Sequence, residues 1–395
     1  MLRSPDTVQR IYLDHNATTP PHPAVIERMT AALREDFGNP SSVHHFGQVA
    51  KASLDEARTA VATLIGADAS EVIFTSGGTE SDNFAIRGVA EALDITGRKH
   101  LIATAIEHEA VLNTFKALAR RGWKTTLLPV DQSGIVSSET LAAALTDDTA
   151  LVSVMHGNNE IGTIQPIAEL ARLAKARGAV FHTDAVQTVG KIPLDVKALG
   201  VDLLSLSAHK FYGPKGVGAL WVRRGLRLQA PITGGKQERS RRAGTENVAG
   251  IVGLGVAAQL AKTKMADEAS RVAPLRDRLE EGVLRSVPGT AVNGARTPRV
   301  PNTTNISFER VEAESLLIAL DLAGVAVSTG SACSSGTLEP SHVLKAMGFP
   351  AHRTQNSIRF SLGAANTQAD IDRVLQVLPG IVEKLRSLTR APVRA

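Results

Sequence analysis

The stretch VIFTSGGTESDNFAIRGVAEAL, residues 72–93, passes from a short apolar run through two glycines into a pattern typical of an amphipathic helix. The same succession of apolar run and helical segment continues toward the C-terminus. Further strand-like runs lie at 100–105, 150–155, 179–183, 203–207 and 217–222. One helical pattern follows the run at 100–105 and ends at residue 121, and another covers 167–177. Short apolar runs that alternate with helices are typical of a sheet covered on both faces. The sequence therefore predicts an α/β fold with a mainly parallel sheet.

The pattern changes after about residue 261, where a long charged helix is predicted to run to residue 285. Strand, helix and strand patterns then follow at 305–308, 312–323 and 357–361. Mixed order of this kind predicts a smaller α+β domain, and a chain of 395 residues is long enough for two domains. We expect a large α/β domain at 16–262, and a small domain, formed by 1–15 and 263–395, that carries the cysteine loop.

Composition places the chain among ordinary globular proteins, with 43% hydrophobic and 21% charged residues. Aromatic residues make up only 4%, which argues against a platform that stacks the bases of single-stranded nucleic acid. The formal net charge is +5. Basic clusters at 236–242 and 384–394 are either solvated faces or contacts for an acidic partner. No zinc-ligand spacing accompanies them, so direct nucleic-acid binding is not expected.

The chain contains a single cysteine, which excludes a disulfide within it and predicts a reducing compartment. The first residues lack the apolar core of a secretory signal. The longest apolar stretch, around 248–258, is too short to cross a bilayer. We therefore expect a cytoplasmic protein without a membrane partner.

Polar residues follow five of the predicted strands at the point where each strand ends. They are Gly77 to Thr79, His108, Asn158 with Asn159, Asp184, and Lys210. In an open α/β sheet, ligands bind beyond the carboxyl ends of the strands. We therefore expect one shared pocket, although loops are also polar for other reasons.

Lys210 ends the run SLSAHK at 205–210, directly after an apolar strand. Most lysines are surface residues, but burial at a strand end lowers a lysine pKa and suits the amine to Schiff-base chemistry. Asp184 follows another strand and has two interpretations of equal weight. It is either a helix N-cap or the carboxylate that keeps the ring nitrogen of a pyridoxal cofactor protonated.

Four further features each have a structural and a chemical interpretation. The turn at 76–81 is either a simple helix cap or a cradle for an anion, in which Thr79 adds a hydroxyl donor. His108 is either a surface histidine among acids or a ring that stacks on a flat cofactor and moves protons. Arg359 is either an exposed strand residue or a guanidinium fork for a carboxylate. Cys333, flanked by small polar residues, is either an inert thiol or a nucleophile on a mobile loop.

Six motifs occur in one order along nearly the whole chain. They are FGNPSS at 37–42, TSGGTESDN at 75–83, HGNNEIG at 156–162, DAVQ at 184–187, GTEN at 244–247 and SACSSG at 331–336. Together they resemble the cysteine desulfurases of the class V aminotransferase group, which are fold-type-I pyridoxal-phosphate enzymes. The cysteine loop and LEPSHVL at 338–344 are similar to the NifS/IscS-like branch. The chain departs from the family at His15, where asparagine is frequent, and at Lys236, which interrupts what is often a third glycine.

This resemblance implies pyridoxal 5′-phosphate as cofactor and L-cysteine as substrate, with alanine as product and a persulfide on Cys333. Lys210 would form the Schiff base and then remove the α-proton, and Asp184 would hold the ring nitrogen. Gln187 would bond the phenolic oxygen, and His108 would stack on the ring and exchange a proton with Cys333. The phosphate would be bound by Gly78, Thr79, Ser207, His209 and Thr245, the last from a second subunit. Asn159 would contact both the cofactor and the substrate carboxylate. Arg359 would also bind the substrate carboxylate.

The resemblance also implies a homodimer and a sulfur-accepting protein, such as an iron–sulfur scaffold. No resident metal is expected, although Cys333 is a candidate transient ligand of an iron–sulfur cluster. Iron–sulfur assembly, nitrogenase maturation and tRNA thiolation all remain open as pathways. An aminotransferase or a selenocysteine lyase on the same scaffold, or a non-enzymatic sulfur-transfer scaffold, are the alternatives. A hydrolase is disfavoured because the sequence lacks a G-x-S-x-G elbow.

Overall fold

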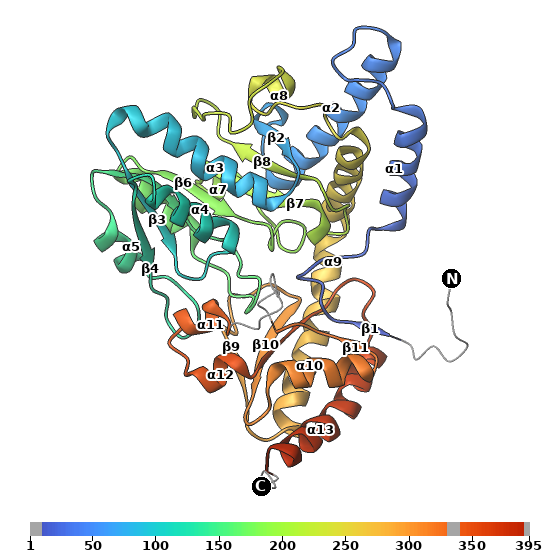
Figure 1. Cartoon of the computed structure of the whole chain (residues 1–395). Helices are drawn as coiled ribbons and strands as arrows, with labels where there is room; N and C mark the ends of the chain where they lie inside the picture. The colour runs from blue at the N-terminus through green and yellow to red at the C-terminus, as the bar shows by residue number, and fades with distance from the viewer. Residues whose placement is uncertain (1–9, 330–339, 391–395) are drawn as a thin grey trace.

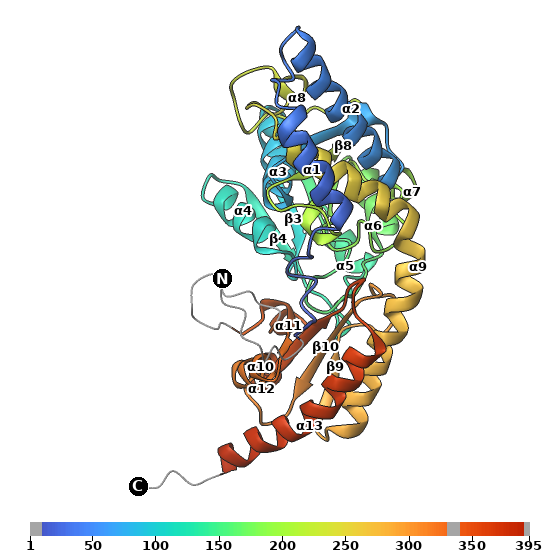
Figure 2. The ribbon, with the colours of Figure 1, turned by 90° about the vertical axis from the view of Figure 1, so that its right-hand side faces the viewer.

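The computed structural model describes residues 10–329 and 340–390, so the loop that carries Cys333 lies outside the described residues. Two groups of strands occupy different parts of the molecule, and the long helix α9 (Val248–Ser286) runs past both of them (Figures 1 and 2). Within the described residues, no helix is both long enough and apolar enough to cross a membrane.

The larger group of strands forms one seven-stranded sheet in the order β2-β8-β7-β6-β5-β3-β4. Only β8 runs antiparallel to its neighbours, and the other strands of this sheet are parallel to one another. The predicted α/β fold with a mainly parallel sheet is confirmed. The strands are β2 (Val72–Thr75), β3 (His100–Thr104), β4 (Lys124–Leu128), β5 (Thr149–Ser153), β6 (Val180–Asp184), β7 (Leu203–Ser207) and β8 (Gly218–Val222).

Helices cover both faces of this sheet because alternate strand residues point to opposite sides. In β2, Val72 and Phe74 pack into one hydrophobic cluster and Ile73 into another. The Ile73 face is covered by α3 (Gly78–Leu93) and α4 (Glu109–Ala119). The opposite face is covered by α2 (His45–Ile65), α5 (Ser138–Ala144), α6 (Ile167–Ala176), α7 (Val196–Leu199) and the first half of α9, against which α1 (Pro23–Glu35) packs.

The smaller group of strands builds a second core. Three antiparallel strands form a sheet in the order β12-β10-β9. A separate parallel pair joins β1 to β11. Ile11 and Leu13 belong to this core together with residues from 272 to 382. The elements around it are β1 (Ile11–Tyr12), β9 (Thr290–Asn293), β10 (Thr303–Phe308), β11 (Val325–Ala326), β12 (Ser357–Ser361), α10 (Ala313–Leu322), α12 (Ala351–Gln355) and α13 (Gln368–Arg390). Helix α11 (His342–Ala346) packs instead into a separate cluster with Ile106, Met155 and Ile161.

Helix α9 unites two segments that the sequence pattern separates. Its apolar beginning packs into the core of the large sheet, where a Cβ at Gly255 would lie 2.7 Å from the Cα atom of Ala57. From Val272 onward the helix contributes to the second core instead. The hydrophobic pattern therefore changes within one helix because its partner changes, and the expected start of the helix near residue 261 is wrong.

A buried ion pair fastens α2 to the segment after β8. The guanidinium of Arg58 donates to both carboxylate oxygens of Glu238, each at 2.7 Å, and lies over the ring of Phe74. The backbone N–H of Phe74 donates to the same carboxylate at 2.9 Å. Glu238, Arg239 and Ser240 in the short element α8 (Gln237–Ser240) all have positive φ, at 45°, 58° and 63°. This backbone is strained, so the ion pair holds a conformation that the residues do not prefer.

We expect Glu238→Gln to lower the free energy of unfolding by about 3 kcal/mol, because it leaves the buried Arg58 without its counter-charge. Urea unfolding of the purified protein measures this loss. The matched control is Asp321→Asn, which breaks the exposed pair with Arg10 and is expected to change stability by less than about 1 kcal/mol. Equal stability of the two variants would contradict a structural role for the buried pair.

Candidate active site

One cavity of about 290 Å³ opens beyond the carboxyl ends of the parallel strands. Ten of the twelve residues that the sequence analysis nominated line it. They are Gly78, Thr79, His108, Asn159, Asp184, Gln187, Ser207, His209, Lys210 and Arg359. The structure thus brings these side chains together, while the role of each stays a prediction.

Two nominated residues are not part of this lining. Thr245 is exposed and is not among the residues that line the cavity. Cys333 lies outside the described residues. The cavity also contains residues that the sequence analysis missed, namely Asn16, Ala17, Asp82, Met155 and Val186. Asp82 had a detectable signal, because it is a carboxylate among the apolar positions of a helix.

Lys210 closes a 3₁₀ turn, Ala208–Lys210, directly after β7. Its Nζ atom donates to the main-chain oxygens of Asn16 and Ala17, at 2.7 and 2.8 Å. Burial, reinforced by the charge of Arg359, lowers the pKa of Lys210 to about 8. The interpretation of Lys210 as a surface lysine is therefore wrong, and a substantial fraction of the amine is neutral near physiological pH.

Asp184 stands at the end of β6 and accepts a hydrogen bond from the N–H of Val186 at 2.9 Å. No helix begins there within the described residues, since the next one is α7, so the N-cap interpretation is wrong. Burial raises the pKa of Asp184, and the nearby His108 and Lys210 oppose this rise. Its carboxyl group lines the cavity together with the amine of Lys210.

Two further acids lie close to Asp184 in the interior. Burial and the charge of Asp184 raise the pKa of Asp82 well above its usual value. Burial also raises the pKa of Glu107 to about 8, although Glu107 accepts from Thr104 Oγ1 and from Met155 N–H. Burial therefore shifts both groups toward their protonated forms, which lowers the repulsion between neighbouring acids in this part of the site.

The glycine turn provides the geometry of an anion cradle. Gly77 has φ of 152°, and a Cβ atom at Gly78 would come within 2.8 Å of Val186 Cγ2. Glycine is therefore required where α3 begins, and the helix N-terminus faces the cavity with its unpaired N–H groups. Ser207 and His209 line the same cavity, and burial together with the charge of Lys210 lowers the pKa of His209 to about 4.

Arg359 is buried, with 3% of its surface exposed, so the interpretation as an exposed strand residue is wrong. Its Nη2 atom donates to Asp14 Oδ1 at 2.6 Å, and its Nη1 atom donates to the main-chain oxygen of Asn159 at 3.0 Å. Among the described residues, the buried Nε atom has no hydrogen-bond partner. Two contacts therefore fix the guanidinium plane, and the remaining N–H groups on Nη1 and Nη2 are left as donors for a ligand.

These residues fit pyridoxal phosphate. The cavity offers an amine of lowered pKa, a carboxylate for a ring nitrogen, the amide of Gln187 and a glycine-lined helix terminus for a phosphate. A cavity of about 290 Å³ is also close in size to ordinary small-molecule sites.

Comparison with known proteins gives one consistent family. The aminotransferase class-V family model matches residues 11–374. A cysteine desulfurase IscS from Dictyoglomus turgidum is 53% identical over 381 residues, which cover 96% of each chain. A solved NifS-like protein is 39% identical, with a TM-score of 0.90 over 95% of this chain and 100% of that one. The structure of SspA in complex with cysteine is 34% identical, with a TM-score of 0.80 over 90% of this chain and 100% of that one.

The matches extend over both groups of strands, so they concern the whole architecture and not one motif. Class-V aminotransferases and cysteine desulfurases depend on pyridoxal phosphate, and this is the cofactor of the present chain. The chain belongs to the class-V aminotransferase family and, within it, to the cysteine desulfurases.

Proposed function

We propose that the protein removes sulfur from L-cysteine, releases alanine and keeps the sulfur on Cys333 as a persulfide. The observation that supports this most strongly is the pairing of Lys210, an amine of lowered pKa, with Asp184 on the walls of one cavity. Bound pyridoxal phosphate would supply an electron sink for the α-carbon of the substrate. Every other part of the reaction falls to side chains of this protein.

Lys210 is the group that moves the α-proton. With a pKa of about 8 its amine accepts a proton from carbon and returns one without a large energy difference near neutral pH. The carbonyls of Asn16 and Ala17 hold Nζ through two hydrogen bonds and so keep the free amine beside its target. Orientation of this kind is a main source of rate enhancement.

Arg359 binds the substrate carboxylate, with Asn159 beside it. Asp14 and the main-chain oxygen of Asn159 fix the guanidinium plane, which leaves the remaining N–H groups on Nη1 and Nη2 for the carboxylate. A fixed fork binds a planar anion with directional hydrogen bonds. Substrate orientation therefore depends on residues that come from the start of the chain, from the loop after β5 and from β12.

His108 prepares the sulfur transfer. Its Nδ1 atom accepts from the N–H of Ala110 at 3.1 Å, so the neutral ring carries its proton on Nε2. Nε2–H can then donate a hydrogen bond to the Cys333 sulfur, which favours the thiolate over the thiol. The Cys333 thiolate attacks the sulfur of the substrate, a sulfur–sulfur bond forms, and the bond from that sulfur to the β-carbon breaks. The β-carbon takes a proton, which gives alanine.

The wider context is also part of the proposal. The name IscS of the similar Dictyoglomus protein supports delivery of the sulfur to an acceptor protein in iron–sulfur assembly, in the cytoplasm. We infer a homodimer in which Thr245 of each chain completes the phosphate site of the other. We also infer a large domain at 16–262 and a small one formed by 1–15 and 263–395, which the two separate cores support.

Lys210→Ala is expected to abolish the visible absorption that a lysine-linked pyridoxal cofactor gives. It should also lower the rate of alanine formation from cysteine by about 1,000-fold or more, because the proton-transfer group is lost. Absorption spectra and an alanine assay of the purified variant measure both. Lys215→Ala, which removes an exposed lysine from the next turn, is the matched control. A coloured and active Lys210→Ala enzyme would refute the assignment.

Cys333→Ser is expected to keep the visible absorption and to lose desulfurase turnover, because a hydroxyl is a far weaker nucleophile toward sulfur. Mass spectrometry after incubation with cysteine should find added sulfur on the protein that keeps Cys333 and none on Cys333→Ser. Normal alanine formation by Cys333→Ser would rule Cys333 out as the acceptor.

The lowered pKa of Lys210 predicts how fast the cofactor-free protein takes up pyridoxal phosphate. Only the neutral amine bonds to an aldehyde, so the rate should rise about tenfold per pH unit below pH 8 and level off above it. Stopped-flow absorbance from pH 6 to pH 10 measures this profile. A rate that continues to rise toward pH 10 would show that Lys210 titrates like an ordinary exposed lysine.

A further inference from the structure

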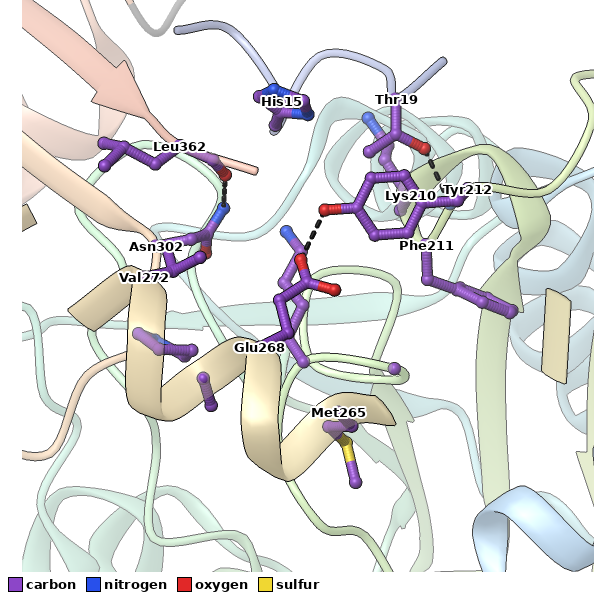
Figure 3. Close-up of a pocket in the computed structure, with 14 residues that line it drawn as sticks. His15, Thr19, Lys210, Phe211, Tyr212, Met265, Glu268, Val272, Asn302 and Leu362 are labelled. Atoms are coloured by element: carbon purple, nitrogen blue, oxygen red, sulfur yellow. Dashed lines mark hydrogen bonds between the residues drawn. The ribbon is translucent and has the colours of Figure 1, made fainter. Parts of the chain in front are cut away.

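A second, smaller cavity of about 20 Å³ lies behind Lys210, on the side of α9, and is called here the rear cavity (Figure 3). Lys210 lines both the rear cavity and the cofactor cavity. A second lysine, Lys191, also lines the rear cavity, and nothing in the proposed mechanism uses it. Two lysine side chains therefore share the wall of the rear cavity, and only Lys210 has a role in the proposed reaction.

Lys191 is connected to the cofactor cavity by a short chain of hydrogen bonds. Its Nζ atom donates to Gln187 Oε1 at 2.7 Å and to Asn16 Oδ1 at 3.0 Å. The Nε2 atom of Gln187 donates to the main-chain oxygen of Asn16 at 2.9 Å. The same oxygen accepts from Lys210 Nζ. Asn16 and Gln187 are both buried, so these bonds are not exchanged for water.

The orientation of the Gln187 amide follows from this arrangement. An amide has a donor end and an acceptor end, whereas a lysine ammonium can only donate. A flipped amide would place Nε2 against Lys191 and Oε1 against the carbonyl of Asn16, which makes two repulsive contacts. Lys191 therefore holds the carbonyl of Gln187 on its own side and leaves the N–H group toward Lys210.

Asn16 does not depend on Lys191 in the same way. Its Nδ2 atom donates to Thr303 Oγ1 and to the main-chain oxygen of Asn159, and its Oδ1 atom also accepts from Asn302 at 3.0 Å. Among the described residues, Lys191 is the donor that bonds to Oε1 of Gln187. Loss of Lys191 should therefore leave Gln187 held by the single bond from Nε2 to the main-chain oxygen of Asn16, while Asn16 stays in place.

A simple structural salt bridge does not explain Lys191. Glu268 lines the rear cavity, but the hydroxyl of Tyr212 donates to its carboxylate (Figure 3). Asn302 on the opposite wall donates to the main-chain oxygen of Leu362. Within residues 10–329 and 340–390, Lys191 makes no ion pair.

We propose that Lys191 is a positioning residue that fixes the amide of Gln187, so that an N–H group faces the phenolic oxygen of the bound cofactor. The proposal rests on the role of Gln187 in the proposed function. A donor at that oxygen stabilises its anionic form, so the lysine-linked cofactor loses its proton at a lower pH. Lys191 would thus set the pH range in which the holoenzyme is ready for substrate.

Lys191 can donate to Gln187 Oε1 in either charge state; in the neutral state, in which its lone pair could also accept, the main-chain oxygen of Asn16 disfavours the flipped amide. Burial, with the charges of Lys210 and Arg359, keeps the pKa of Lys191 well below its usual value, and Glu268 opposes this shift. His15 also lines the rear cavity, and burial lowers its pKa to about 4, so its ring is neutral. A neutral amine still has two N–H donors, which match the two acceptors on Gln187 and Asn16.

The test is a pH titration of the visible absorption of the holoenzyme. Lys191→Met is expected to raise the apparent pKa of this absorption by about one unit, which corresponds to one lost hydrogen bond to a charged group. Lys191→Arg, which keeps the donors, should restore the original value. The control Lys215→Met removes an exposed lysine near His209 and should leave the titration unchanged. An unshifted titration in Lys191→Met would overturn the proposal.

A double-mutant cycle separates positioning from a general charge effect. Gln187→Ala alone should raise the apparent pKa, and adding Lys191→Met should give no further shift. An equal shift in both backgrounds would overturn the proposal, because Lys191 would then act without Gln187. If Lys191→Met does not fold, Lys191→Ala provides the second test, since it removes the same donor to Gln187 Oε1 with a smaller side chain. It should raise the pKa as well.

The proposed function and this inference fail in different ways. If Gln187→Ala leaves the titration unchanged, Gln187 does not contact the phenolic oxygen, and the inference falls with that assignment. If Gln187→Ala shifts the titration and Lys191→Met does not, the assignment of Gln187 stands and only the role of Lys191 is refuted. Turnover of cysteine by the same variants, with kcat and KM determined separately, identifies loss of the desulfurase activity itself.

Discussion

The two hydrogen bonds from Lys210 to the main-chain oxygens of Asn16 and Ala17 are the contacts on which the site depends. They join the end of β7 in the large sheet to the start of the chain. That start belongs to the second core, since Asp14 bridges to Ser361 of β12 and pairs with Arg359. The amine and the guanidinium are therefore positioned by one short segment, and a shift between the two cores would displace both.

Removal from water controls the charges around this segment. It lowers the pKa of Lys210 to about 8 and raises that of Glu107 to about 8, so cationic and acidic groups both move toward neutral forms. Arg359 and Asp14 form an ion pair at 2.6 Å in the same part of the site. A cofactor that carries a phosphate and a ring cation therefore enters a site in which few charges compete with its own.

Strand periodicity was sufficient to predict the central sheet from sequence, because those strands are buried on both faces and read as apolar runs. It missed β4, whose residues KTTLL are half exposed at the edge of the sheet. Polar residues that stand directly after strand ends led to Lys210 and Asp184. Asn16 and Lys191 were not found, because their importance arises from contacts between segments far apart in the chain, such as Asn16 with Gln187 and Asn302.

The segment that carries Thr245 shows how a local strain can serve a distant site. Residues 238–240 adopt positive φ angles, and the pair of Glu238 with Arg58 holds them there. Two residues later, Arg242 donates to the carboxylate of Glu80 in the first turn of α3, beside the glycine cradle. The segment is thus anchored on both sides of a bend, and Thr245 emerges on the surface, away from the cavity of its own chain. The buried pair of Glu238 with Arg58 thus fixes a strained backbone directly before the residue that contacts the first turn of α3.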